Sequence, residues 1–305
     1  MCLACALGGG GAALGSARSP FPLAAEPWPL AGEARLGVTA TWTGVAGLVL
    51  EAQGTRIAFD PFVTRPGLWA TLLRAPRIDR AAVARHFSGL AAVFVGHAHH
   101  DHAQDLPAVA ESSPAARLVG GPTVVELCRR SGLAATRLVA AQDGLVVEAG
   151  PFRVEALAAQ HGHVPVLGAI DRLALDAPGL PRTPFRYPRG EVLAWRVEVG
   201  GRAIHVQGSA GLDDTALLRQ RPADVLLACL AARKGTPRYL ERLCERLQPK
   251  VLVPLHHDDF FRPLAEPPRP IATLRWQAFL SEADAVQRAH GTRLWCPARM
   301  APTAW

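Results

Sequence analysis

Four of the eleven histidines in this chain fall within six residues, in the sequence GHAHHDH at positions 96–102. Neutral imidazole is the commonest zinc ligand in proteins, and a carboxylate supplies an oxygen ligand. His97 and His99 are two residues apart, so both side chains point to the same side of an extended turn. Asp101 and His102 follow where the chain is expected to turn towards a helix. The cluster therefore predicts two neighbouring metal positions rather than a solvated polar loop.

The element that positions this cluster is a short apolar run, AAVFV at residues 91–95, which we interpret as a buried strand. Gly96 breaks the run, and the histidines begin at once. Ligands in open sheets gather at the carboxyl ends of strands. The placement therefore favours a functional site at a sheet edge.

The first half of the chain alternates strand and helix patterns. Three short strands with glycine-containing turns predict an antiparallel meander that ends at Asp60-Pro61. These strands are expected at 35–42, 47–52 and 56–59, and further strands at 117–119, 137–139, 145–147 and 152–158. Helices are expected at 79–86, 106–111 and 123–130.

The second half repeats this alternation after a segment rich in proline and glycine. That segment, residues 162–190, has no clear period and is expected to be a long loop that acts as a lid. Strands are expected at 191–199, 202–206, 224–227, 250–254 and 293–295, and helices at 213–219, 238–247 and 271–290. Strands and helices in both halves predict two sheets with helices outside.

The spacing H-x-H-x-D-H resembles the signature of the metallo-β-lactamase-fold hydrolases. That resemblance implies a four-layer α/β/β/α sandwich over residues 33–305. It places His161, in AQHG, with His97 and His99 at a first metal. Asp60, in IAFDP, would orient the histidine loop.

The same resemblance places His256, in VPLH, with Asp101 and His102 at a second metal. The details around His161 and His256 look closest to the branch with phospholipase-D-like and lactonase-like members.

One position departs from the family pattern. The fourth motif of the family normally ends in Gly-Asp, whose carboxylate bridges two metals, but Gly208 is followed here by Ser209. Serine is a poor neutral ligand, and the lost negative charge would have balanced two divalent ions. We therefore expect weaker occupancy of the second position. Asp213, Asp214, Asp258 and Asp259 are candidate substitutes, and Asp258 is the better placed because it follows His256 by two residues.

Other residues near the motifs are expected to support ligands or to contact substrate. His163 and His257 lie beside predicted ligands, whereas His100 is expected to face away. The loop at 162–190 carries several arginines, among them Arg186. Arginine binds carboxylate and phosphate with two parallel hydrogen bonds, so this loop is compatible with an anionic substrate; a merely solvated arginine-rich loop is the alternative.

These residues predict a zinc-dependent hydrolase. A bound zinc lowers the pKa of its water towards about 7, so that hydroxide attacks an ester, lactone or phosphodiester bond. Asp101 would orient the water or accept its proton. The predicted substrate is a small or lipid-like anionic molecule. Two alternatives stay open: a nuclease of the same fold, and a non-hydrolytic metal-binding module with a degenerate second site.

Composition limits the choice of partners. The chain has 305 residues, with 33 Lys and Arg against 26 Asp and Glu, a net charge of +7. Only Lys234 and Lys250 are lysines, and no run of five basic residues occurs. This argues against dedicated nucleic-acid binding. No stretch reaches the ~18–20 apolar residues of a membrane span. The oligomeric state is left open.

The N-terminal residues differ in composition from the rest of the chain. Residues 1–17 are apolar or small, like the apolar region of an export signal, but the charged region that normally precedes it is missing. A truncated leader and a cytoplasmic tail both fit this pattern. We therefore exclude residues 1–32 from the predicted domain.

Overall fold

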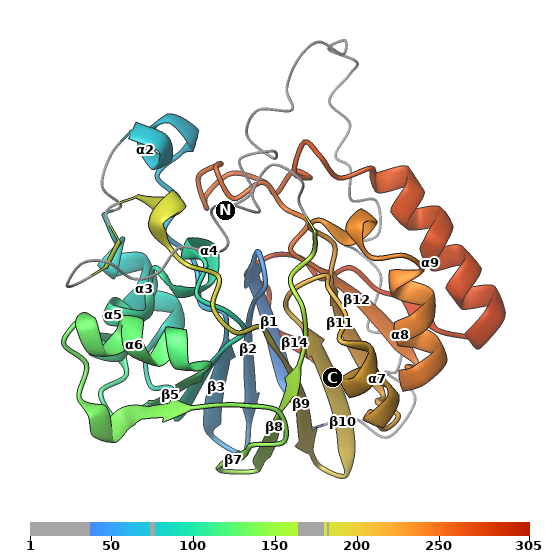
Figure 1. Ribbon diagram of the computed structural model, residues 1–305, viewed down its shortest axis with the longest axis horizontal. Helices are drawn as coiled ribbons and strands as arrows, with labels where there is room; N and C mark the ends of the chain where they lie inside the picture. The colour runs from blue at the N-terminus through green and yellow to red at the C-terminus, as the bar shows by residue number, and fades with distance from the viewer. Residues whose placement is uncertain (1–36, 74–76, 164–179, 182) are drawn as a thin grey trace.

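The computed structural model describes residues 37–73, 77–163, 180–181 and 183–305. Two sheets lie face to face at its centre, and helices cover the outer side of each (Figure 1). This is the predicted four-layer α/β/β/α sandwich. The predicted N-terminal segment at 1–32 and most of the predicted loop at 162–190 lie outside the described residues.

The first sheet combines an antiparallel meander with a parallel half. Its strands, in spatial order, are β14 (Thr303–Ala304), β1 (Thr39–Gly44), β2 (Gly47–Ala52), β3 (Thr55–Phe59), β4 (Ala92–Val95), β5 (Arg117–Gly120) and β6 (Leu138–Ala140). β1 to β3 pair antiparallel, as their glycine turns predict. β3 to β6 pair parallel, so the loops that follow β3 and β4 leave the same edge.

The second sheet has a similar division. Its strands, in spatial order, are β13 (Arg293–Leu294), β12 (Val251–Leu255), β11 (Val225–Cys229), β10 (Arg202–Gln207), β9 (Leu193–Val199), β8 (Phe152–Ala158) and β7 (Val146–Ala149). β7 to β10 pair antiparallel, and β10 to β13 pair parallel. The carboxyl ends of β8, β10 and β12 therefore share one edge.

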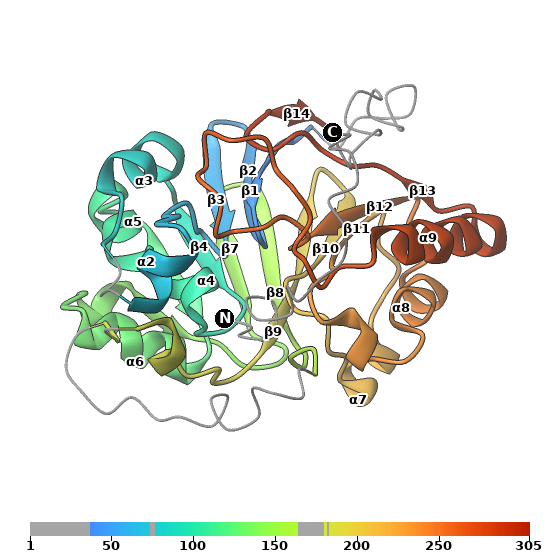
Figure 2. The ribbon, with the colours of Figure 1, turned by 90° about the horizontal axis from the view of Figure 1, so that it is seen from above.

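Helices complete the outer layers (Figure 2). On the side of the first sheet lie α2 (Leu68–Leu73), α3 (Arg80–Phe87), α4 (His100–Ala103), α5 (Leu106–Ser112) and α6 (Pro122–Arg130). On the side of the second lie α7 (Asp214–Arg219), α8 (Tyr239–Leu247) and α9 (Trp276–His290). Short 3₁₀ helices cover Ala135–Arg137, Pro184–Arg186 and Arg233–Gly235. Within the described residues, no helix is both long and apolar enough to cross a membrane.

Three apolar clusters separate the four layers. The largest lies between the sheets, where Phe94 packs edge-on against Trp195 with ring centroids 5.2 Å apart. One further cluster joins the first sheet to its helices, and another joins the second sheet to α8 and α9. Because each sheet buries both faces, its central parallel strands, such as β4, β11 and β12, are largely apolar.

Most elements follow the predictions. The first strand, expected at 35–42, is β1 at Thr39–Gly44, the short 3₁₀ helices were not expected, and three further differences concern α9, α2 and β14. The last helix begins at Trp276 instead of residue 271, because the N–H of Ile271 donates to the His257 carbonyl and holds that segment against the loop after β12. Helix α2 and strand β14 were not expected. Both are short, and the two residues of β14 are positioned by pairing with β1.

Candidate metal centre

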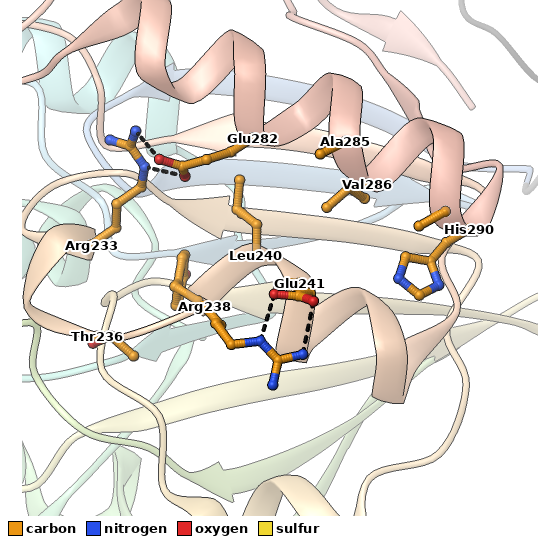
Figure 3. A pocket seen from close by; sticks show the side chains of 11 residues that line it. Arg233, Thr236, Arg238, Leu240, Glu241, Glu282, Ala285, Val286 and His290 are labelled. Atoms are coloured by element: carbon orange, nitrogen blue, oxygen red, sulfur yellow. Dashed lines mark hydrogen bonds and ion pairs between the residues drawn. The ribbon is translucent and has the colours of Figure 1, made fainter.

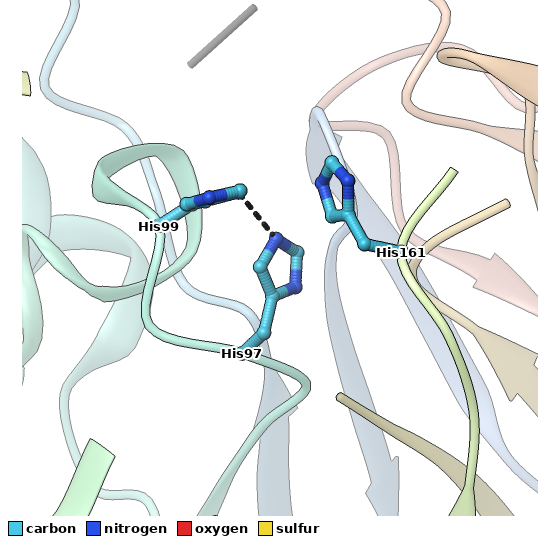
Figure 4. Close-up of side chains that lie close together, drawn as sticks. All are labelled: His97, His99 and His161. Atoms are coloured by element: carbon cyan, nitrogen blue, oxygen red, sulfur yellow. Dashed lines mark hydrogen bonds between the residues drawn. The ribbon is translucent and has the colours of Figure 1, made fainter. Parts of the chain in front are cut away.

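Three histidines from both sheets form a first group. His97 and His99 follow β4, whereas His161 follows β8, and their ligating nitrogens lie within 4.8 Å of one another. His97 Nε2 is 3.0 Å from His99 Nδ1. Figure 4 shows the three rings gathered between the loop after β4 and the chain after β8. The structure thus brings together residues that are 64 positions apart in the sequence.

The protonation state of these rings suits metal binding. His97 is 1% exposed, and burial lowers its pKa well below the usual value, with a further contribution from the neighbouring histidines. Burial likewise lowers the pKa of His99. Both rings are therefore neutral near pH 7, and the neutral ring is the form that binds a divalent ion.

A second group joins the two sheets again. Asp101 and His102 lie in α4, and His256 follows β12; their ligating atoms also lie within 4.8 Å of one another. The Asp101 Oδ2 is 3.2 Å from His256 Nε2. All three side chains are buried. One carboxylate and two imidazoles are a donor set for a divalent cation.

Asp60 connects the end of β3 to the histidine loop. Its Oδ1 accepts a hydrogen bond from the Gly96 N–H at 2.7 Å, and its Oδ2 is 3.2 Å from His102 Nδ1. Burial would lower the pKa of His102, but the Asp60 carboxylate outweighs it and raises that pKa. A carboxylate on one ring nitrogen leaves the other for a metal and fixes the direction of the ring. These contacts fit the orienting role expected for Asp60.

Gly208 is required by this arrangement. A Cβ at Gly208 would lie 2.6 Å from Asp60 Oδ2, closer than any real contact. The glycine of the fourth motif therefore lets β10 approach the buried carboxylate.

Ser209 lies at the end of β10 and is 5% exposed. Its Oγ is 3.4 Å from the Gly162 N–H, which donates to it, and its carbonyl accepts from Gln207 Nε2 at 2.8 Å. Among the described residues, no side chain belongs to both groups. The position of the family's bridging carboxylate is thus held by a hydroxyl beside the chain that carries His161.

Asp258 has partners of its own and belongs to neither group. Its Oδ1 accepts from the Val45 N–H at 2.7 Å, and its Oδ2 is 2.8 Å from Arg65 Nη2 and 3.4 Å from Arg299 Nη1. Burial opposes ionisation, but Arg65 outweighs it and holds the pKa of Asp258 well below its usual range. Both oxygens are therefore engaged by the protein.

The remaining predicted residues lie outside the two groups. His257 is stacked on Trp42 with ring centroids 4.6 Å apart, and burial lowers its pKa to about 4. His100 packs edge-on against Phe62 and, at 5.9 Å, against Phe260. His163 and Arg186 are exposed.

Sequence reasoning missed two buried residues beside the centre. Asp105 accepts hydrogen bonds from the N–H groups of Val63 and Thr64, at 2.8 and 2.9 Å, and fixes the loop after β3. Only the position of Asp105, three residues after His102, could have pointed to it in the sequence. Arg65, the partner of Asp258, lies in the same loop, and neither spacing nor periodicity in the sequence singles it out.

A cavity of about 500 Å³ lies elsewhere, between α8 and α9 (Figure 3). Arg233 there makes two hydrogen bonds of 3.0 Å to Glu282, and Arg238 pairs with Glu241. None of its lining residues belongs to either histidine group. It therefore offers no ligand set for metal-dependent chemistry.

Comparison with known proteins agrees with this geometry. Residues 55–257 match the family described as "Beta-lactamase superfamily domain". A relative named "UPF0173 metal-dependent hydrolase", from Carboxydothermus hydrogenoformans, is 26% identical over 222 residues, 72% of this chain and 84% of the relative.

Two solved structures show the same fold. Igni18, described as a metallo hydrolase from Ignicoccus hospitalis, aligns with a TM-score of 0.57 at 18% identity, over 88% of this chain and 99% of Igni18. CmlA, described as a diiron β-hydroxylase from Streptomyces venezuelae, aligns with a TM-score of 0.59 at 14% identity, over 88% of this chain and 54% of CmlA. The chain thus belongs to the β-lactamase superfamily, as a metal-dependent hydrolase with the metallo-β-lactamase fold.

Proposed function

We propose that this protein is a zinc hydrolase that cleaves an ester, lactone or phosphodiester bond of an anionic substrate. The observation that carries the proposal is the pair of donor groups at one sheet edge, His97–His99–His161 and Asp101–His102–His256, of which only His161 is partly exposed. Three imidazoles are a donor set typical of catalytic zinc, which keeps a coordination position for water or substrate. The second set adds a carboxylate.

The metal supplies one part of the chemistry: when bound, zinc polarises a carbonyl or phosphoryl oxygen and lowers the pKa of a coordinated water from about 15.7 to about 7. The residues of the chain supply the rest. Asp101, 3.2 Å from His256, orients the attacking water or accepts its proton. Asp60 holds His102 in one ring orientation, so the second group is preorganised.

The anionic character of the substrate rests on arginines in a segment that contacts the histidine motif through its backbone. Arg186 lies exposed in the 3₁₀ helix at 184–186, and the carbonyl of Arg189 accepts a hydrogen bond from the N–H of Ala98, within the histidine motif. The chain that carries these arginines therefore adjoins the ligand loop. A guanidinium in that place suits a carboxylate or a phosphate.

The test combines metal analysis with an assay panel. The full chain is purified, its metal content is measured, and it is assayed on lactone, thioester and phosphodiester model substrates and on single-stranded DNA. We expect hydrolysis of a small anionic substrate. His97→Ala should reduce the rate to background and lower the bound metal, since it removes one of three ligands. His290→Ala, at an exposed histidine of α9, is the matched control and should change neither.

Three outcomes would contradict parts of the proposal. Full activity of His97→Ala would refute the metal assignment. Cleavage of DNA alone would indicate the nuclease alternative. Tight metal binding without hydrolysis of any panel member would favour the non-hydrolytic module, the alternative that Ser209 supports, since the described ligand groups share no side chain.

A further inference from the structure

The backbone at His256 is strained. Its φ is +51°, in the left-handed region that residues with a side chain rarely adopt. It persists only where the surroundings fix it. The tip of the β1–β2 hairpin does so at two points. The Val45 carbonyl accepts the His256 N–H at 2.7 Å, and the Val45 N–H donates to Asp258 Oδ1, also at 2.7 Å.

A buried ion pair holds Asp258 in its place under this hairpin tip. Arg65 Nη2 is 2.8 Å from Asp258 Oδ2, with the two side chains 1% and 0% exposed. Gly44 makes room for the pair: a Cβ there would collide with the Arg65 guanidinium and lie 3.0 Å from Asp258 Oδ2. Its φ of +100° also suits glycine alone. The hairpin tip is therefore shaped around this ion pair.

The loop that carries Arg65 is itself fixed to the histidine motif. Asp105, directly after α4, accepts the N–H groups of Val63 and Thr64. Through Asp105, the ion pair therefore connects the region of α4, which carries Asp101 and His102, to the loop after β12, which carries His256. These three ligands form the second group, so the ion pair, together with Asp105, links the two regions that the metal would join.

We propose that Arg65 and Asp258 are positioning residues for the second metal site, in place of the ligand role expected for Asp258 from the sequence. The inference rests on the metal centre of the proposed function. Arg65 holds Asp258, Asp258 holds Val45, and both Val45 and Asp258 fix the strained turn that presents His256. The pair acts through His256 and contacts no metal.

The charges around Asp258 decide which variant can test this role. Two buried arginines, Arg65 and Arg299, face one buried carboxylate. Removing Asp258 would leave two buried cations unpaired, which is strongly destabilising. Arg65→Met instead leaves one carboxylate and one guanidinium. Arg299→Met leaves the same balance and is the matched control, because Arg299 lies 3.4 Å from Asp258 and comes from the segment after β13.

The experiment is a calorimetric titration of the metal-free full chain with Zn²⁺. We expect two phases, the weaker assigned to the second group by its loss in His256→Ala. Arg65→Met should raise the Kd of the weaker phase about 10- to 100-fold, the usual effect of losing a residue that supports a ligand, and leave the tighter phase unchanged. Arg299→Met should change either Kd much less, since the Arg299 guanidinium lies farther from Asp258, at 3.4 Å, and also donates to the carbonyls of Leu264 and Glu266. Thermal melting of the metal-free variants checks that they fold.

The results that overturn the inference differ from those that overturn the proposed function. The inference is refuted if a folded Arg65→Met variant binds zinc with unchanged affinities. It is also refuted if Arg65→Met and Arg299→Met weaken zinc binding equally. Wild-type protein that takes up no zinc refutes the metal centre itself. If Arg65→Met does not fold, Arg65→Lys keeps the charge with a different reach and should weaken the second phase selectively; an unchanged second phase there also refutes the inference.

Discussion

At the scale of single residues, we expect Ser209 to affect the balance between the two candidate metal positions. It stands where the family has a bridging aspartate, and its Oγ accepts a hydrogen bond from Gly162 beside the first group. Without a shared carboxylate, two divalent ions are less well shielded from each other's charge. We expect about one equivalent of metal after dialysis of the native chain, and Ser209→Asp should raise this towards two. Metal content per chain, measured by mass spectrometry, checks the prediction.

Ser281→Asp is the control for the added negative charge, because Ser281 is exposed on α9. It should leave the metal content at its native value. Two tightly held equivalents in the native chain, unchanged by Ser209→Asp, would mean that another residue bridges the ions.

Single residues also mark the limit of prediction from sequence. Four ligands could be predicted because they lie close together in the chain and all are residue types that bind metals: His97, His99, Asp101 and His102. The structure places them as that pattern implies. Arg65 could not be predicted, since no local sequence pattern distinguishes it from the other arginines. Its role depends on Asp258, 193 positions away, and on a glycine in a third segment.

Among the elements, β10 ends beside Asp60, the buried carboxylate that follows β3. A Cβ at Gly208 would lie 2.6 Å from Asp60 Oδ2, so Gly208→Ala must displace the carboxylate that holds Gly96 and His102. We expect a loss of about 1–3 kcal/mol in the free energy of unfolding, as for other overpacked sites. The affinity for the second metal should also fall. Urea unfolding and zinc titration measure the two effects.

Gly54→Ala is a control for Gly208→Ala, because it introduces backbone strain without a steric clash. Gly54 has a φ of +73°, and no atom lies within 4 Å of the place that an alanine Cβ would take, so alanine there is strained without a collision. It should cost about 1 kcal/mol and leave metal binding unchanged. Equal metal affinity in Gly208→Ala and the native chain would show that Asp60 tolerates displacement.

Elements with a strong local pattern were predictable, and those fixed by distant contacts were not. The β1–β3 meander followed from alternating residues and glycine turns, and α3 from Asp79, whose side chain accepts the Ala82 N–H at its start. Strand β14 has two residues and depends on pairing with β1. The first turn expected of α9 is lost because residue 271 pairs with the loop after β12.

For the whole molecule, both ligand groups join one sheet to the other. A metal that binds the folded chain alone stabilises it by about 2.7 kcal/mol when its free concentration is a hundred times its Kd. We therefore expect a chelator to lower Tm by about 5–10 °C, using the usual scaling for large domains. Scanning calorimetry with and without chelator measures the shift. The double variant His97→Ala/His256→Ala should melt at the same temperature in both conditions; a native Tm that ignores the chelator would contradict the prediction.

Buried neutral histidines make the stability of the whole chain dependent on pH. Burial lowers the pKa of His205 and of His257 to about 4, from an ordinary value of 6.5. Between these values the unfolded chain binds protons that the folded chain does not, so acid favours unfolding. The free energy of unfolding should fall as pH drops from about 6.5 to about 4, by up to about 1.4 kcal/mol per pH unit for each histidine. Above that window these two groups contribute no slope.

Urea unfolding of the metal-free chain between about pH 5 and about pH 7.5 measures this slope without interference from metal binding. His205→Gln removes one titrating group and retains an amide that can donate to Gln207, the present partner of His205 at 3.1 Å. Its slope below about pH 6.5 should therefore be shallower by up to about 1.4 kcal/mol per pH unit, since one fewer proton distinguishes the two states. An identical slope in the variant would mean that His205 is protonated in the folded chain, against the burial that lowers its pKa.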